Sequence, residues 1–283
     1  MGFEGAGSAG PGVEAPTDGG ATEFRVTLDG VHVRLGDRQV FRGLSCGFPR
    51  NRISVVLGGS GGGKSTLLRL IGGLLRPDAG SVRVAGRDWA RLGRRELFRE
   101  RRRIGMLFQG GALLDSMTLF ENVALPLREH SELGEAEIAS EVAARLAAVG
   151  LPGTQHLYPR QLSGGMMRRA ALARAIVMDP EIVLCDEPFS GLDPVNVRRI
   201  ESLLVDLNRR LGITLILTSH HVRSTLRMAD RIVFLEDGLA RSGSSDSIRT
   251  EPRVEAFLSA EQDDYAPPEE ADRAAPAAPG AAP

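Results

Sequence analysis

The sequence has no long hydrophobic run and little cysteine, and these two shortages exclude several classes of protein. No stretch approaches the ~18 apolar residues that a membrane-spanning helix needs. The longest apolar runs, at 182–185 and 213–217, are typical of buried strands. The two cysteines, Cys46 and Cys185, match no disulfide or metal-binding spacing. Residues 1–23 have neither the basic start nor the apolar core of a secretory signal, so we expect a cytoplasmic protein.

Net charge is also small. The formal charge of −1 argues against a general nucleic-acid-binding surface, so no nucleic-acid partner is expected. One basic segment, 87–103, carries eight arginines against three carboxylates. It predicts a solvated helix face, and a patch that meets anionic membrane lipid or a partner is the alternative.

Lysine is almost absent, because Lys64 is the only lysine among the 35 Lys and Arg residues. It lies in GGSGGGKST at 58–66, which fits the spacing of a phosphate-binding loop between a buried strand and a helix. Glycines let backbone N–H groups curl around phosphate, and slim lysine fits where the wide fork of arginine does not. The sequence therefore predicts a nucleotide bound by Gly58, Gly59, Ser60, Gly61, Gly62, Gly63, Lys64, Ser65 and Thr66, with Ser65 on Mg²⁺.

The pattern between residues 24 and 243 predicts an α/β fold. Residues 24–35 and 39–48 alternate like antiparallel strands, and 52–58 is a continuous apolar run, typical of a strand buried on both faces. Later strands alternate with helices, which implies a parallel central sheet. The later strands are expected at 181–186, 214–219 and 231–236, and helices at 64–74, 119–128, 135–149, 163–178, 195–211 and 221–229.

The alternation is interrupted from about 111 to 178, where only helices are expected, so this stretch predicts an inserted α-helical subdomain. The nucleotide-binding domain is expected to span 24–243, with a helical extension at 244–260. Residues 1–23 and 261–283 are rich in small residues, proline or acidic residues. They cannot bury enough apolar surface to offset the entropy of ordering, so both are expected to be disordered.

A pair of carboxylates follows the apolar run at 182–185. Asp186 and Glu187 would emerge at the C-terminal end of a central parallel strand, where ligands bind in open α/β sheets. We expect Asp186 to hold Mg²⁺ through water and Glu187 to polarise the water that attacks the γ-phosphate. Two solvated carboxylates that close a strand are the simpler alternative.

The segment QLSGGMMRRAALARAI at 161–176 opens a helix with Ser163, Gly164 and Gly165, whose N–H groups and hydroxyl suit an anion. With this segment the chain resembles the ATP-binding cassette (ABC) ATPases, and residues 24–243 carry that family's motifs in order. The resemblance implies an ABC-type P-loop ATPase core in which the Ser163–Gly165 turn contacts the γ-phosphate of ATP held by a second copy. Two chains would then sandwich two ATP molecules.

The resemblance also implies roles for single residues. Gln109 would sense Mg²⁺ and the attacking water, and Asp193 would bridge to the phosphate loop of the partner. His220 would contact the γ-phosphate, with the neighbouring His221 as the alternative at the start of a helix.

The adenine site departs from the family pattern. Relatives stack adenine on an aromatic residue upstream of the lysine, and Val33 stands at that place in this sequence. Part of the stacking energy, ~1–3 kcal/mol, would be missing, so base selectivity would be loose. Phe41 is an alternative contact from a neighbouring strand.

The cargo is indicated by a narrower resemblance. FQGGALLDSM at 108–117, PLREH at 126–130 and EPRVEAFLSA at 251–260 are similar to ATPases of the phospholipid-trafficking systems built around Mce-domain proteins, the Mla type. This implies a motor on the cytoplasmic face of the inner membrane, with a multi-spanning permease, an Mce-domain protein and, in some relatives, a STAS-domain subunit. The alternatives are an importer of another small solute, a soluble non-transport ABC ATPase, and a non-hydrolysing ATP-gated module.

Overall fold

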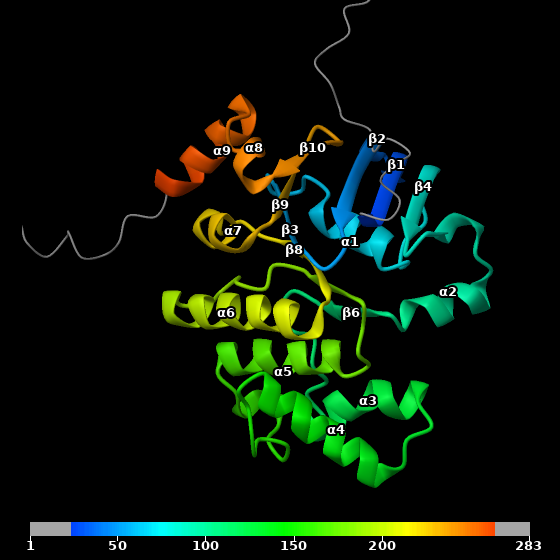
Figure 1. Ribbon diagram of the computed structural model, residues 1–283, viewed down its shortest axis with the longest axis vertical. Helices are drawn as coiled ribbons and strands as arrows, with labels where there is room; N and C mark the ends of the chain where they lie inside the picture. Colours follow the sequence, from blue (N-terminus) through cyan, green and yellow to red (C-terminus); the bar gives the residue numbers. More distant parts are fainter. Residues whose placement is uncertain (1–23, 264–283) are drawn as a thin grey trace, which may run out of the picture.

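The structure, a computed structural model, describes residues 24–263 of the 283-residue chain. These residues form two sheets with helices packed against them (Figure 1). The disorder expected for 1–23 and 261–283 lies outside the described residues, except at 261–263, which are helical. The last helix, α9 (Pro252–Asp263), continues past residue 260, where the sequence predicts its end.

The smaller sheet is antiparallel, with the strand order β2-β1-β4-β5. Strands β1 (Phe24–Leu35) and β2 (Arg38–Pro49) are the two that the alternation predicts. Strands β4 (Ala79–Val84) and β5 (Arg87–Asp88) have no predicted counterpart. Only two residues of β4 are buried, so its apolar pattern in the sequence is too weak to indicate a strand.

The larger sheet has the strand order β10-β9-β3-β8-β7-β6. Its strands from β9 to β6 are parallel, as the alternation of strands and helices predicts. The edge strand β10 pairs antiparallel with β9 and has no predicted counterpart. The strands are β3 (Ile53–Gly58), β6 (Ile104–Leu107), β7 (Ile182–Cys185), β8 (Thr214–Thr218), β9 (Arg231–Glu236) and β10 (Leu239–Ser244).

Every predicted helix is present, with ends that differ by a few residues from the sequence pattern. The first helix stops at Ile71 because two glycines follow, and Gly73 has a φ of 65°. The helices are α1 (Lys64–Ile71), α2 (Arg94–Arg101), α3 (Leu119–His130), α4 (Glu135–Ala148), α5 (Gly164–Ile176), α6 (Pro194–Leu211), α7 (Val222–Met228), α8 (Ser245–Ile248) and α9, with single 3₁₀ turns η1 (Trp89–Arg91) and η2 (Pro159–Gln161).

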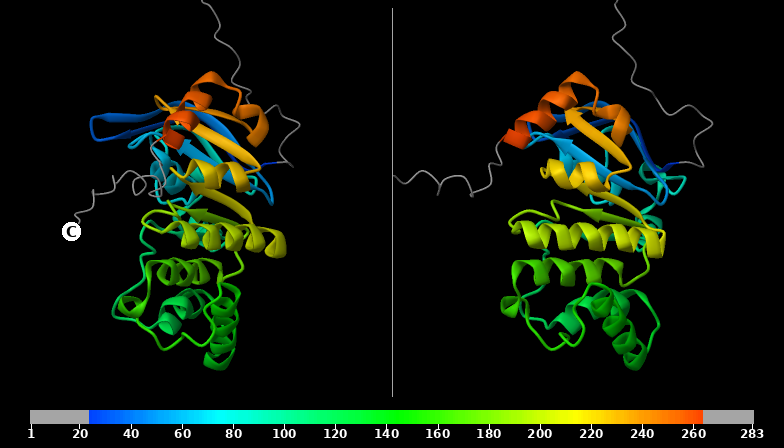
Figure 2. Two further views of the ribbon diagram at one scale, coloured as in Figure 1. Left: turned by 90° about the vertical axis from the view of Figure 1, so that its left-hand side faces the viewer. Right: turned by 60° about the vertical axis from the view of Figure 1, so that its left-hand side comes forward.

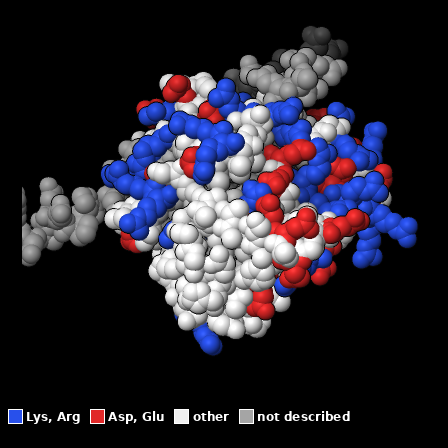
Figure 3. Space-filling model, turned by 60° about the horizontal axis from the view of Figure 1, so that its bottom comes forward, with Lys and Arg blue, Asp and Glu red and all other residues white. Residues whose placement is uncertain are grey.

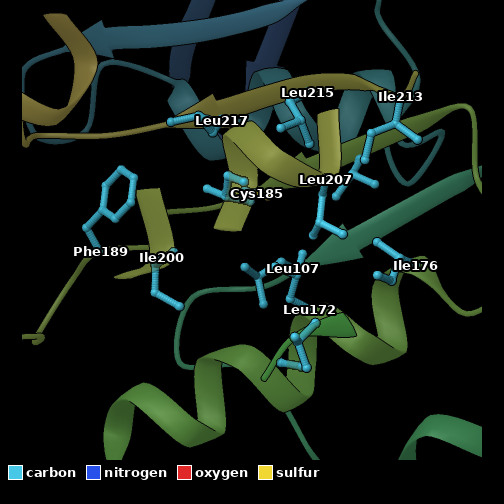
Figure 4. Close-up of a cluster of buried hydrophobic side chains, with 14 of the residues drawn as sticks. Leu107, Leu172, Ile176, Cys185, Phe189, Ile200, Leu207, Ile213, Leu215 and Leu217 are labelled. Carbon is cyan, nitrogen blue, oxygen red and sulfur yellow. The ribbon is translucent and has the colours of Figure 1, made fainter. Parts of the chain in front are cut away.

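Both faces of the central sheet are covered, which explains its continuous apolar strands. Along β3, Val55 and Leu57 face a core formed with α5 and α6, whereas Val56 faces a core shared with α1 and the antiparallel sheet. Figure 4 shows the first core, where Leu172 of α5 and Cys185 of β7 lie among the packed side chains.

Helices α3, α4 and α5 pack on one another between β6 and β7 in the chain. They lie at the end of the molecule opposite β1 and β2 (Figure 2). Among residues 24–263, none of the helices combines the length and the apolar character that crossing a bilayer requires.

Candidate nucleotide-binding site

The predicted phosphate loop, residues 58–63, connects the buried strand β3 to helix α1 at the carboxyl end of the central sheet. Strand β3 lies inside the sheet, between β9 and β8, so the loop sits where open α/β sheets bind ligands. The loop lines a pocket of about 390 Å³. Side chains from distant parts of the sequence complete this pocket, namely Leu35, Arg38, Val40, Gln109, Glu187, Ser190 and His220.

Two glycines of the loop are required by its geometry. Gly58 has a φ of 145°, and a Cβ there would lie 2.5 Å from the carbonyl oxygen of Leu235. Gly63, at the N-cap of α1, has a φ of 97°, and a Cβ there would lie 2.8 Å from Cε1 of Phe41. Residues with a side chain rarely adopt either backbone conformation. These glycines therefore let the loop turn sharply into α1, whose N-terminal end is the positive end of the helix dipole and favours an anion.

Lys64 lies inside the curl of its own loop. Lys64 is only 7% exposed, and its Nζ donates hydrogen bonds to the carbonyl oxygens of Gly58 (2.8 Å) and Gly59 (3.1 Å). The loop backbone thus surrounds the lysine side chain closely and holds its ammonium group at the pocket. The wider planar guanidinium of an arginine does not match this space.

Asp186 follows β7 directly, as predicted, and joins three elements. Its Oδ1 accepts hydrogen bonds from Oγ of Ser65 on α1 (3.1 Å) and from Oγ1 of Thr218 on β8 (2.8 Å). Hydroxyl and carboxylate oxygens are the ligands that Mg²⁺ prefers, usually together with substrate phosphates. The described residues contain no group of three or more His, Cys, Asp or Glu that could hold a metal ion by themselves. The residues present therefore fit an ion shared between Ser65, Asp186 and a bound phosphate.

Glu187 has an unusual backbone conformation, with a φ of 47°. Its N–H donates a hydrogen bond to Oγ1 of Thr218 (2.9 Å), which fixes the residue at the edge of the pocket. Its Oε1 is buried and, apart from the contact with Nε2 of His220 at 3.1 Å, has no polar partner within residues 24–263. A buried carboxylate oxygen with free accepting capacity can hold and polarise a water molecule.

The two neighbouring histidines face different surroundings. His220 lines the phosphate pocket, whereas the ring of His221 packs edge-to-face against Phe189 at 5.8 Å. The arrangement agrees with the choice of His220 over His221 from the sequence. Gln109 lies two residues beyond β6, is exposed and lines the same pocket. The structure thus brings Lys64, Glu187, Gln109 and His220 together.

The predicted adenine contact is wrong. Val33 is 1% exposed and belongs to the core beneath the antiparallel sheet, and Phe41, the alternative, is fully buried there. Leu35, 42% exposed at the end of β1, lines the pocket instead, as does Arg38, whose Nη2 donates to the carbonyl oxygen of Gly61 (2.6 Å). The alternate side chains of β1 are buried up to Val33, and only the last of them, Leu35, lies outside the core. The sequence alone does not indicate where this change occurs.

The Ser-Gly-Gly turn begins α5, as predicted. Ser163 and Gly164 are exposed, and Oγ of Ser163 accepts a hydrogen bond from the N–H of Met166 (3.3 Å). Gly165 is buried, and a Cβ there would lie 2.7 Å from Oδ1 of Asn196. None of these residues lines the pocket around the phosphate loop of the same chain.

Asp193 is the N-cap of α6 and does not line that pocket either. Its side chain accepts hydrogen bonds from the N–H groups of Asn196 and Val195 (both 3.0 Å). The hydrogen bond from Asn196 is the main cause that lowers the pKa of Asp193. Within one chain, Asp193 therefore stabilises a helix end.

Thr218 is the residue that sequence reasoning missed. It is fully buried at the end of β8 and holds both Asp186 and Glu187 through one hydroxyl. The available signal is a threonine that ends a buried strand, one strand away from the carboxylates. That signal becomes useful only when β7 and β8 are known to be neighbours.

Comparisons with known proteins agree with this geometry. A family model described as ABC transporter matches residues 41–190. The chain is 45% identical to the Haemophilus influenzae "Intermembrane phospholipid transport system ATP-binding protein MlaF", over 81% of this chain and 88% of that protein. It is 39% identical to the Mycobacterium tuberculosis "Probable ribonucleotide transport ATP-binding protein mkl", over 86% of this chain and 69% of that protein.

Solved structures match as well. A dimeric ATP-binding cassette bound to ADP and phosphate superposes with a TM-score of 0.71 at 30% identity, over 78% of this chain and 98% of that chain. A Clostridium perfringens cassette that is part of an ABC transporter complex superposes with a TM-score of 0.74 at 26% identity, over 84% of this chain and 95% of that chain. Family match, relatives and fold agree: the chain belongs to the ABC transporter family and is one of its ATP-binding ATPases.

Proposed function

We propose that this chain is the ATP-hydrolysing motor of a membrane transporter that moves phospholipid. The observation that carries the motor assignment is that Lys64 and Glu187 line one pocket beside the phosphate loop. Asp186 is joined to the same pocket by the hydrogen bond that it accepts from Ser65. The phospholipid cargo is supported by the 45% identity to a relative named for intermembrane phospholipid transport.

In this proposal the phosphates of ATP lie in the loop, against its N–H groups and those of the first turn of α1. Lys64 exchanges its bonds to two loop carbonyls for bonds to phosphate oxygens. Mg²⁺, held by Ser65, Gln109 and, through water, Asp186, would neutralise charge between the β- and γ-phosphates. Glu187 accepts a hydrogen bond from the attacking water.

The base would lie against Leu35 and Arg38, which line the loop pocket. Neither side chain offers an aromatic face, so base selectivity is expected to be weak. Competition between ATP and GTP in a hydrolysis assay measures this directly, and a strong preference for ATP would require a base-specific contact from another residue.

We propose further that the reaction centre is completed by a second copy. Ser163, Gly164 and Gly165 lie outside the pocket of their own chain, at the start of α5, where Ser163 and Gly164 are exposed. In the closed dimer they would contact the γ-phosphate on the partner, and Asp193 would reach the partner's phosphate loop. The dimeric cassette with ADP and phosphate among the structural neighbours supports this arrangement.

Mixing two inactive variants tests the shared site. In a dimer of one Lys64→Ala chain and one Ser163→Arg chain, one of the two shared centres receives an intact loop and an intact turn. We expect the mixture to regain ATP hydrolysis that neither variant has alone. If each chain worked with its own turn, the mixture would stay as inactive as the separate variants.

The permease is expected to dock in a groove between α2, β6, α3 and α5, next to the segment that carries Gln109. Its floor is apolar and includes Met106, Phe108, Leu114, Leu125 and Met178. Through this groove the motor would sit on the cytoplasmic face of the membrane, with an Mce-domain protein in the assembly and a STAS-domain subunit as a possible addition.

The working units would be an ATPase domain of 24–243, with its helical subdomain at about 111–178, and the extension at 244–260.

The transport assignment is tested with the complex of this chain and its permease. We expect wild-type complex to transfer labelled phospholipid between vesicles when ATP is present. The Glu187→Gln complex should bind ATP, accumulate as a closed dimer and transfer no lipid, while Glu255→Gln, an exposed matched control on α9, should behave as wild type. ATP-dependent movement of a ribonucleotide or another small solute, with no lipid transfer, would replace the phospholipid proposal.

A further inference from the structure

Helix α2 presents a face made almost entirely of arginine. Arg94, Arg95 and Arg99, with Phe98 among them, lie at i, i+1, i+5 and i+4, so they share one side of the helix. These four residues are called the arginine face. All are exposed, and α2 buries none of its residues. Within residues 24–263 the guanidinium groups of this face have no ion-pair or hydrogen-bond partner.

The opposite side of α2 carries its carboxylates, and these are already paired. Glu100 accepts hydrogen bonds from Arg87 (2.6 Å) and Arg103 (3.1 Å), and Glu96 accepts one from Arg87 (3.3 Å). Leu97, also on that side, packs against the core. The helix is thus fixed with its arginine face outward, and no carboxylate on α2 is left to neutralise it.

Phe98 lies in the middle of the arginine face and is 55% exposed. One edge of its ring meets His130 at the end of α3, at 5.4 Å between ring centroids, and the rest faces solvent. Leaving so much aromatic surface in water is unfavourable. Clusters of arginine attract anionic lipid headgroups, and aromatic side chains also concentrate at the level of the headgroups.

Helix α2 lies beside the groove that the proposed function gives to the permease. Phe98, Arg101 and Arg102 form part of the lining of this apolar groove between α2 and α3. The arginine face therefore continues from the rim of that groove. Figure 3 shows basic side chains, with acidic ones between them, on the side of the molecule where Figure 1 places α2.

We propose that the arginine face is a membrane-binding surface that contacts anionic phospholipid headgroups beside the permease. A convex helix with unpaired arginines around one aromatic ring fits a diffuse anionic surface. A protein partner would instead need carboxylates placed for specific paired contacts. The inference goes beyond the proposed function, rests on it only for placing the chain at a membrane, and does not depend on the cargo.

The test is co-sedimentation of the full chain with vesicles of phosphatidylcholine, with and without phosphatidylglycerol. Each arginine near an anionic surface strengthens binding by about fivefold. We therefore expect R94Q/R95Q/R99Q to weaken binding to the anionic vesicles by on the order of 100-fold. The control R198Q/R199Q/R209Q removes the same charge from exposed positions on α6 and should bind as wild type. Binding should also be lost near 1 M salt, where the Debye length is about 3 Å.

A second measurement tests whether the side chain at position 98 contacts the membrane. Phe98→Trp introduces an indole whose fluorescence should shift to the blue with anionic vesicles only, against the constant background of Trp89, which is 5% exposed. Equal vesicle binding by the two triple variants, or no spectral shift, would overturn the proposal. Loss of permease association with unchanged vesicle binding would instead assign the face to an acidic protein partner. Hydrolysis by the R94Q/R95Q/R99Q chain should stay at the wild-type rate, which separates this test from the test of the motor.

Discussion

Replacing Thr218 with valine removes a hydroxyl on which both carboxylates of the site depend. Oγ1 donates to Asp186 (2.8 Å) and accepts from the N–H of Glu187 (2.9 Å). A hydrogen bond to a carboxylate contributes about 1.5–3 kcal/mol and one between neutral groups about 1 kcal/mol. We therefore expect Thr218→Val to lower the free energy of unfolding by about 3 kcal/mol, which corresponds to a fall in Tm of roughly 6–12 °C.

The catalytic effect should be separable from the loss of stability. Without the Thr218 hydroxyl, the strained backbone of Glu187 loses the hydrogen bond that holds it. Replacing a residue that orients a catalytic group in this way typically lowers activity by about 10–100-fold. Turnover is measured as phosphate release at saturating ATP, below the Tm of the variant. Thr218→Ser keeps the hydroxyl and should restore most of the activity.

A threonine at the other end of the same strand provides the matched control. Thr214 is equally buried and accepts a hydrogen bond from the N–H of Asn51 (3.0 Å), far from the carboxylates in the strand register. Thr214→Val should lower Tm but leave phosphate release per folded chain unchanged. Wild-type turnover and Tm in Thr218→Val would refute the role assigned to this hydroxyl.

Three further predictions concern the loop and the buried thiols. Lys64→Arg should abolish hydrolysis with the fold retained, because the guanidinium does not fit inside the loop, and wild-type turnover would contradict the steric argument. Gly58→Ala should destabilise the chain by more than about 2 kcal/mol in denaturant unfolding, because its Cβ would lie 2.5 Å from a backbone oxygen at a φ of 145°. Burial raises the pKa of Cys46 and Cys185 to about 12, so the native chain should resist iodoacetamide at pH 8 until guanidinium unfolds it, and rapid labelling of the native chain would contradict the burial.

The same thiols give a pH dependence with a definite sign. Because the folded state favours the protonated form, their contribution to stability is complete below the ordinary cysteine pKa of 9.0. It is lost as pH rises from there toward about 12. Denaturant midpoints measured between these limits should fall with pH, and a Cys46→Ala/Cys185→Ala chain should lose that part of the slope.

The local part of the site was predictable from the sequence. A Gly-rich loop between a strand and a helix has one main geometry, and two acidic residues after a buried strand must emerge at its carboxyl end. Choosing His220 over His221 also required only the spacing after a strand. In each case neighbours along the chain set the position of the side chain.

The parts that were missed depend on neighbours far along the chain. Thr218 matters because β7 and β8 are adjacent, although Thr218 is separated from Asp186 by 32 residues of sequence. Strand β4 was missed because its few buried side chains pack on β1 and β2 rather than repeating a pattern of their own.

The sequence by itself determined the nucleotide chemistry, because the loop, the carboxylates and the start of α5 each obtain their geometry from a short run of backbone. Only the tertiary structure decided that Leu35 rather than Val33 reaches the pocket, and that α2 turns its arginines outward. Those outcomes depend on where a strand leaves the core and which side of a helix the surrounding protein covers, and neither is encoded within a short window of sequence.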